Sequence, residues 1–130
     1  MRNTIIAIIV AGALIFFALN FNKTVQENKT EQKIPANNVS VVDGKQIIEI
    51  TAKGGYIPER SIAKAGIPSI LRFNTNGTFD CSSSVRIPSM NLFKMLPQSG
   101  TTDIDLGIQK TGTLSGSCGM GMYPFEIDFQ

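Results

Sequence analysis

The sequence contains no histidine and no tryptophan. Histidine is the commonest general base in enzymes and the commonest ligand of transition metals. Without it we can assemble no pair of nucleophile and base, and we therefore expect no enzyme. Any metal site must use sulfur or oxygen. Sulfur is available, because the chain carries two cysteines and five methionines.

The sequence also lacks a strong excess of either positive or negative charge. Twelve Lys and Arg residues stand against ten Asp and Glu residues, and they are interspersed along the chain. No basic stripe of the kind that binds phosphate backbones is visible, so we expect no nucleic-acid partner. The length of 130 residues permits one ordinary domain with appendages.

The N-terminal segment is continuously apolar from Ile5 to Leu19, and residues 3–22 carry no charge. This run lies between the length of a membrane-spanning helix, about 20 residues, and the apolar region of a cleavable signal, about 10 to 14. No small-residue cleavage pattern closely follows it. We therefore predict a signal anchor, a transmembrane helix over residues 1–22, and leave open whether it is cleaved. Its very short leading tail is typical of an export signal, which would place the rest of the chain in a periplasmic or extracellular location.

Residues 23–44 are rich in Lys, Glu, Gln, Asn and Thr. Such a composition cannot bury enough apolar surface to offset the entropy lost on ordering. We predict a flexible polar linker over residues 23–44, followed by a folded domain over residues 45–130.

Short apolar runs separated by Gly, Pro and Asn characterise residues 45–130. We expect strands at residues 46–52, 61–64, 68–74, 83–87, 101–106, 112–118 and 125–129, and an irregular segment or single helical turn at residues 88–98. Short strands without a convincing amphipathic helix predict an all-β, antiparallel Greek-key sandwich.

Sulfur is concentrated between the last two expected strands, in the segment Cys118-Gly119-Met120-Gly121-Met122. The glycines let the backbone turn tightly, so that Met120 and Met122 can converge with Cys118. Thiolates and thioethers are soft ligands that suit Cu(I). The second thiol, Cys81, follows the expected strand at residues 68–74, and strands distant in sequence can be neighbours in a sandwich.

The segments LRFNTNGTFDCSSSVRI, residues 71–87, and GTLSGSCGMGM, residues 112–122, resemble the cupredoxins. They are most similar to the small cupredoxin-like domains found in bacterial envelope proteins and alongside copper-transporting ATPases. The pattern of those domains comprises a GGY-x-P turn, here residues 54–58, a Cys at the position of the first His in plastocyanin-type members, and a terminal CGMGM. The resemblance covers nearly all of residues 45–130.

The resemblance implies a copper site with Cys81 and Cys118 as ligands and with Met120 or Met122 completing the set. Met122 is the favoured thioether ligand, because a reach of two residues back from Met120 to Cys118 is geometrically tight, and we keep both methionines as candidates. Blue-copper sites use two His, one Cys and a long axial Met, and this chain has no His. Because two thiolates tend to reduce Cu(II), we expect copper to be held as Cu(I). Together with the predicted anchor, this copper site predicts a membrane-tethered protein of copper homeostasis that holds copper and delivers it to a copper transporter or an oxidase.

Three alternatives stay open. Two cysteines in an exported domain often form a disulfide, which would stabilise the fold by on the order of 3 to 4 kcal/mol and could belong to an interaction domain without metal. Copper could instead cycle between oxidation states in electron transfer. Methionine is also a common core residue; we assign that role to Met90 and Met95, and either Met120 or Met122 could share it.

Overall fold

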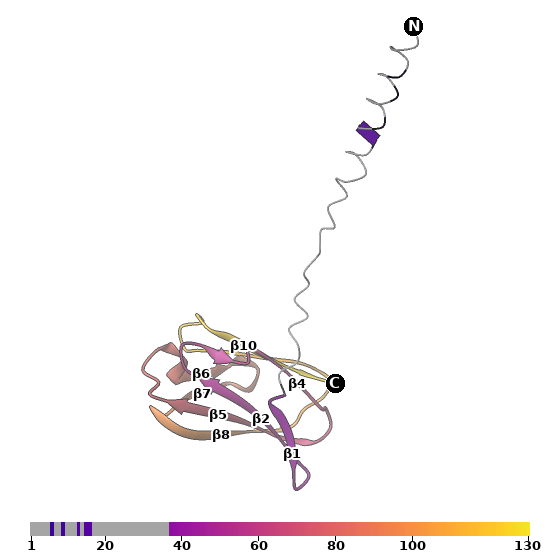
Figure 1. Ribbon diagram of the computed structural model, residues 1–130. Helices are drawn as coiled ribbons and strands as arrows, with labels where there is room; N and C mark the ends of the chain where they lie inside the picture. The colour runs from indigo at the N-terminus through magenta and orange to yellow at the C-terminus, as the bar shows by residue number, and fades with distance from the viewer. Residues whose placement is uncertain (1–5, 7–8, 10–12, 14, 17–36) are drawn as a thin grey trace. The chain divides into compact units, whose positions relative to one another are not determined.

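The computed structural model describes Ile6, Ile9, Ala13, Ile15, Phe16 and residues 37–130 (Figure 1). The first five are helical and exposed. The rest of the predicted transmembrane helix, and the predicted linker as far as residue 36, lie outside the described residues. Among the residues that are described, no helix is both long enough and apolar enough to cross a membrane.

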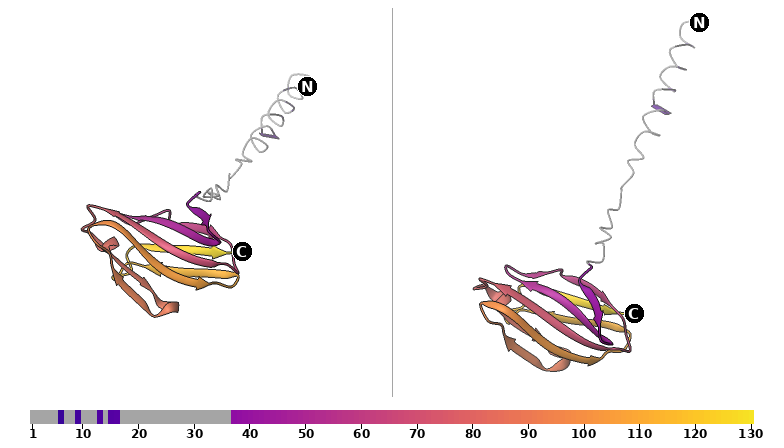
Figure 2. Two further views of the ribbon diagram at one scale, coloured as in Figure 1. Left: turned by 90° about the horizontal axis from the view of Figure 1, so that it is seen from below. Right: turned by 60° about the horizontal axis from the view of Figure 1, so that its bottom comes forward.

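Residues 37–130 fold into two stacked β-sheets (Figures 1 and 2). The first sheet has the order β1-β2-β5-β8, with β3 paired to β2. Its strands are β1 (Val39–Val42), β2 (Lys45–Ala52), β3 (Tyr56–Ile57), β5 (Pro68–Asn76) and β8 (Ser99–Ile108). The second sheet has the order β4-β10-β9-β6-β7. Its strands are β4 (Arg60–Ala63), β10 (Pro124–Phe129), β9 (Gly112–Ser117), β6 (Ser84–Ile87) and β7 (Leu92–Met95).

Both sheets are mixed, which corrects the expectation of purely antiparallel pairing. Strand β2 runs parallel to β5, and β4 runs parallel to β10. The remaining strand pairs are antiparallel. The all-β class and the sandwich architecture are nevertheless as predicted.

All seven expected strands are present, with ends shifted by one or a few residues. Three further strands occupy places that were predicted otherwise. The short strand β3 lies in the expected turn at residues 54–58 and pairs with β2. Val39–Val42, assigned to the linker, forms β1 and pairs with residues 45–48 of β2, so the folded part begins before residue 45. The segment 88–98, expected to be irregular, contains the 3₁₀ turn η2 (Pro88–Met90) and strand β7, which pairs with β6.

Alternation of buried and exposed positions explains how the strands build the core. In β2 and β5 nearly every second side chain is fully or almost fully buried between the sheets, as the period of an extended strand requires. Strands of the opposite sheet supply the other half of the core. The largest fully buried aliphatic side chains are Ile48, Ile50, Leu71, Ile87, Ile127 and Val85.

Three aromatic rings pack together in this core. Tyr56, Phe73 and Phe125 meet edge to face, with ring centroids 5.1 to 5.6 Å apart, a separation at which the ring quadrupoles attract. Gly116 of β9 lies directly opposite Phe125 of β10. A Cβ atom at position 116 would overlap the Phe125 ring, so glycine is required there by space.

We predict that Gly116→Ala lowers the free energy of unfolding by about 1 to 3 kcal/mol, because the added methyl group overpacks the core. Urea denaturation of the two proteins measures the difference. Ser115→Ala, an exposed change on the same strand, is the control and is expected to alter stability little. Equal midpoints for the Gly116→Ala and parent proteins would contradict the packing argument.

Candidate functional site

The two cysteines meet although they lie 37 positions apart in the sequence. Cys81 opens the 3₁₀ turn η1 (Cys81–Ser83) and Cys118 directly follows β9. Their sulfurs form a disulfide, with the Cα atoms 5.8 Å apart. Cys118 is fully buried, whereas Cys81 is only partly buried against the core. The structure therefore brings the two predicted thiol ligands together, in the bonded form that was the alternative to a metal site.

Asp80 fixes the turn that carries Cys81. Its carboxylate accepts hydrogen bonds from the backbone N–H of Ser82, at 2.8 Å, and from the Ser82 hydroxyl. It also accepts from the backbone N–H of Gly54, at 2.9 Å. The bonds from Ser82 and Gly54 lower the pKa of Asp80. Asp80 is exposed, but it ties the Gly54-Gly55 turn to η1 and is more than a solvated charge.

The loop after Cys118 is closed by its own backbone. The N–H of Cys118 donates to the carbonyl of Tyr123, at 3.0 Å, and the N–H of Gly121 donates to the carbonyl of Cys118, at 2.9 Å. Gly121 has a φ of +73°, in the left-handed region that glycine adopts without strain. The glycine pattern of this segment is thus explained in part by a tight turn, as the sequence indicated.

Ser84 joins the two segments that bear the cysteines. Its hydroxyl donates to the carbonyl of Cys81, at 3.2 Å, and accepts from the backbone N–H of Gly119, at 3.0 Å. Ser84 is not among the site residues predicted from the sequence. The available signal was its place three residues after Cys81, a spacing at which a serine hydroxyl can reach a backbone carbonyl. Nothing local in the sequence indicated the bond from Gly119.

Tyr56 connects this site to the aromatic core. Its phenol donates to the backbone carbonyl of Ser84, at 2.6 Å. Burial raises the pKa of Tyr56, and the nearby charge of Asp80 raises it further. The phenol therefore keeps its proton and remains a donor across the ordinary pH range.

Met120 and Met122 belong to the surface, with 79% and 61% of their areas exposed. Neither is a core residue, so that alternative is wrong for both. Met122 lines a hollow on the side of Gly54, Gly55 and Tyr123. The other side of the loop, at Gly119, faces strands β6 and β7.

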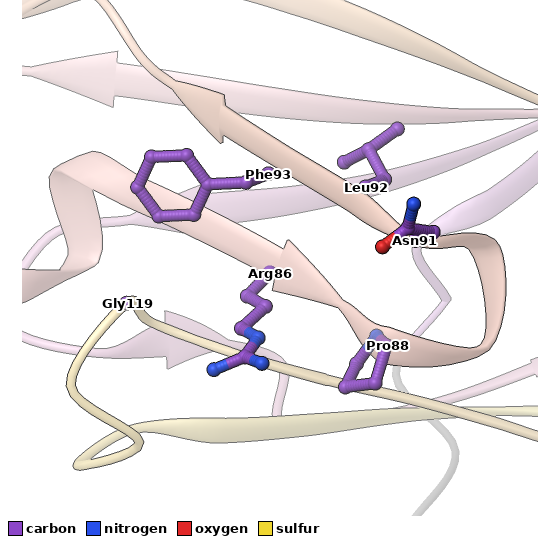
Figure 3. Close-up of a pocket in the computed structure, with 6 residues that line it drawn as sticks. All are labelled: Arg86, Pro88, Asn91, Leu92, Phe93 and Gly119. Atoms are coloured by element: carbon purple, nitrogen blue, oxygen red, sulfur yellow. The ribbon is translucent and has the colours of Figure 1, made fainter.

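A second hollow of about 390 Å³ lies on that other side (Figure 3). Gly119, Arg86 of β6 and Phe93 of β7 contribute to its lining. A Cβ atom on Gly119 would lie 3.2 Å from Cε2 of Phe93 and 3.0 Å from the Ser84 hydroxyl oxygen. The loop is therefore seated closely on the outer face of the β6–β7 hairpin.

The donor set fits a soft metal ion once the disulfide is reduced. Two cysteine sulfurs are brought into contact by the fold, and two thioether side chains occupy the loop that begins with one of them. Soft sulfur ligands suit monovalent copper better than Mg, Ca or Mn. Across residues 37–130 and the five described N-terminal residues, no group of three or more His, Cys, Asp or Glu side chains is placed to hold a metal.

Solved structures that share this fold include two of copper-binding proteins. The metal-binding domain of the Cu(I)-exporting P-type ATPase CopA of Streptococcus pneumoniae D39, with Cu(I), is 24% identical to the chain, with a TM-score of 0.63. The similarity covers 71% of this chain and 92% of that domain. A copper-binding protein in the apo form is 23% identical, with a TM-score of 0.65, and the similarity covers 71% of this chain and 94% of that protein.

No curated protein matches the chain. The family model of the cupredoxin-like domain matches residues 7–126. This match spans most of the 130 residues, and the resemblance inferred from the sequence is confirmed. The chain belongs to the cupredoxin-like domain family.

Proposed function

We propose that this protein binds copper as Cu(I) through the thiolates of Cys81 and Cys118, with Met120 and Met122 as thioether ligands. The observation that carries the proposal is the meeting of the two cysteines beside a loop that bears two exposed methionines. The fold shared with copper-binding domains supports it. Copper is the cargo of the protein in this proposal, and the protein acts as a binding protein without enzymatic activity.

Copper binding requires reduction of the disulfide first. Two electrons and two protons convert the Cys81–Cys118 disulfide into two thiols, and a thiol reductant supplies both by becoming a disulfide itself. The thiols lose their protons when they bind the metal. The disulfide form then represents the protein before it is reduced for loading.

The partner that we propose is a membrane copper transporter or an oxidase. The CopA domain is part of a Cu(I)-exporting ATPase, which supports the transporter in particular. We further propose that residues 1–22 anchor the chain and hold the domain on the extracytoplasmic side.

Loss of one thiol is expected to abolish tight binding. Reduced Cys118→Ser protein is expected to bind Cu(I) at least about 100-fold more weakly than the parent, since removing even a group that supports a metal ligand costs about 10 to 100-fold. Anaerobic competition with a chromophoric Cu(I) chelator measures the affinity. Ser115→Ala is the matched control, and the unreduced parent is expected to bind no Cu(I) at the cysteines. An unchanged affinity in Cys118→Ser would overturn the proposal.

Ser84→Ala removes the hydroxyl that joins the Cys81 turn to the Cys118 loop, at 3.2 and 3.0 Å. We predict about a tenfold loss of Cu(I) affinity, typical of a group that orients metal ligands. The same chelator competition measures it, and Ser84→Thr, which keeps a hydroxyl, is expected to retain most of the affinity. Equal losses in the Ala and Thr variants would show that the hydroxyl does not act in this way.

The proposed anchor is tested by fractionation. The full chain is expected to remain with membranes after washing at alkaline pH, because a spanning apolar helix is not released by loss of charge contacts. A variant that lacks residues 1–22 is expected to be recovered in the soluble fraction. Recovery of the full chain in that fraction would contradict an uncleaved anchor.

A further inference from the structure

The prediction that Met95 is a core residue is wrong. Met95 is 62% exposed, whereas Met90 is partly buried and packs against the core. Methionine is among the residues most often buried, and single exposed apolar side chains are ordinary on protein surfaces. The position of Met95 is informative because it lies beside the elements that carry the cysteines.

Strand register places Met95 next to the site. Met95 of β7 is directly opposite Ser84 of β6. In an antiparallel pair, opposed side chains lie on the same face with Cβ atoms about 4.5 to 5.5 Å apart. The Ser84 side chain on that face contacts the Cys81 carbonyl and the Gly119 N–H. Met95 is thus one strand away from the hydroxyl that joins both cysteine segments.

The backbone after Met95 is tied to the same place. The N–H of Leu96 donates to the carbonyl of Ser83, at 2.7 Å, and Ser83 ends the turn that Cys81 begins. The backbone of Met95 is therefore held beside the Cys81 turn. Its side chain has three rotatable bonds and can adapt its reach.

The outer face of β7 also abuts the Cys118 loop. Phe93, two residues before Met95 and on the same face of the strand, lies so close to Gly119 that a Cβ atom there would be 3.2 Å from its ring. Met120 follows Gly119, and Met122 lies toward the opposite side of the loop, by Gly54 and Gly55. The residue that directly precedes Met120 therefore lies against the β7 face.

We propose that Met95 supplies an additional thioether ligand, from strand β7, to the Cu(I) held at Cys81 and Cys118, on the Met120 side of the loop. This inference rests on the proposed function. A thioether is neutral and has no proton to lose, so it can engage a soft monovalent ion at the surface without the proton release that a thiol requires. Because Met95 is exposed, its sulfur can bind a copper ion that is entering or leaving the site, in place of another ligand of that ion.

The test uses the full, reduced chain labelled with ¹³C at the methionine methyl groups. Titration with Cu(I), or with Ag(I) as a redox-inert substitute, is expected to shift the Met95 methyl signal together with that of Met120. The Met95→Leu variant keeps the volume and removes the sulfur. It is expected to bind Cu(I) about tenfold more weakly in chelator competition, the order of loss for a supporting group of a metal site.

Met90→Leu is the matched control and is expected to leave the affinity unchanged. Urea denaturation of both variants checks that stability is not the cause of any loss. An unmoved Met95 methyl signal, or a shifted signal with full affinity in Met95→Leu, would overturn the role of Met95. If Cys118→Ser loses binding while Met95→Leu does not, only this inference fails; if neither variant loses binding, the proposed function fails as well.

Discussion

The hydrogen bond from the Tyr56 phenol to the carbonyl of Ser84 links the core of this protein to its surface site. A buried hydroxyl without a partner would cost about 1 to 3 kcal/mol, so the carbonyl of Ser84 is held where the phenol can reach it. The ring of Tyr56 is fixed in turn by Phe73 and Phe125 from the two sheets. The position of Ser84 thus depends on the packing of the whole sandwich.

The hydrogen bond between Tyr56 and Ser84 also fixes the position of the site. Ser84 presents its carbonyl to the core and its hydroxyl to both cysteine segments. Asp80 adds a second tie, since it binds Gly54 of the turn that precedes Tyr56. The Gly54-Gly55-Tyr56 turn and the turn that bears Cys81 are therefore connected by hydrogen bonds through Asp80. The cysteines are thus held by a rigid support, and a metal bound there as proposed would cost them little conformational freedom.

The sequence was most informative where one face of a strand is buried and least informative at the sheet edges. Strand β2 shows alternation and was predicted nearly to its ends, whereas β1 and β7 have mostly exposed side chains and carry no period-2 signal. The parallel pairs β2–β5 and β4–β10 depend on long-range contacts that no local pattern specifies. The family resemblance implied that Cys81 and Cys118 lie close together, whereas the disulfide between them was the alternative expected from the frequency of disulfides in exported domains. The roles of Ser84 and the exposure of Met95 could not be predicted, because both depend on the β6–β7 hairpin.

The unequal burial of the two cysteines has a kinetic consequence. Thiol–disulfide exchange proceeds by attack of a thiolate on an accessible sulfur, and Cys118 is fully buried while Cys81 is not. An incoming reductant thiolate would therefore attack the Cys81 sulfur and form the mixed disulfide there, and Cys118 would be released as the thiolate. The fold thereby assigns different chemical roles to two residues that are identical in type.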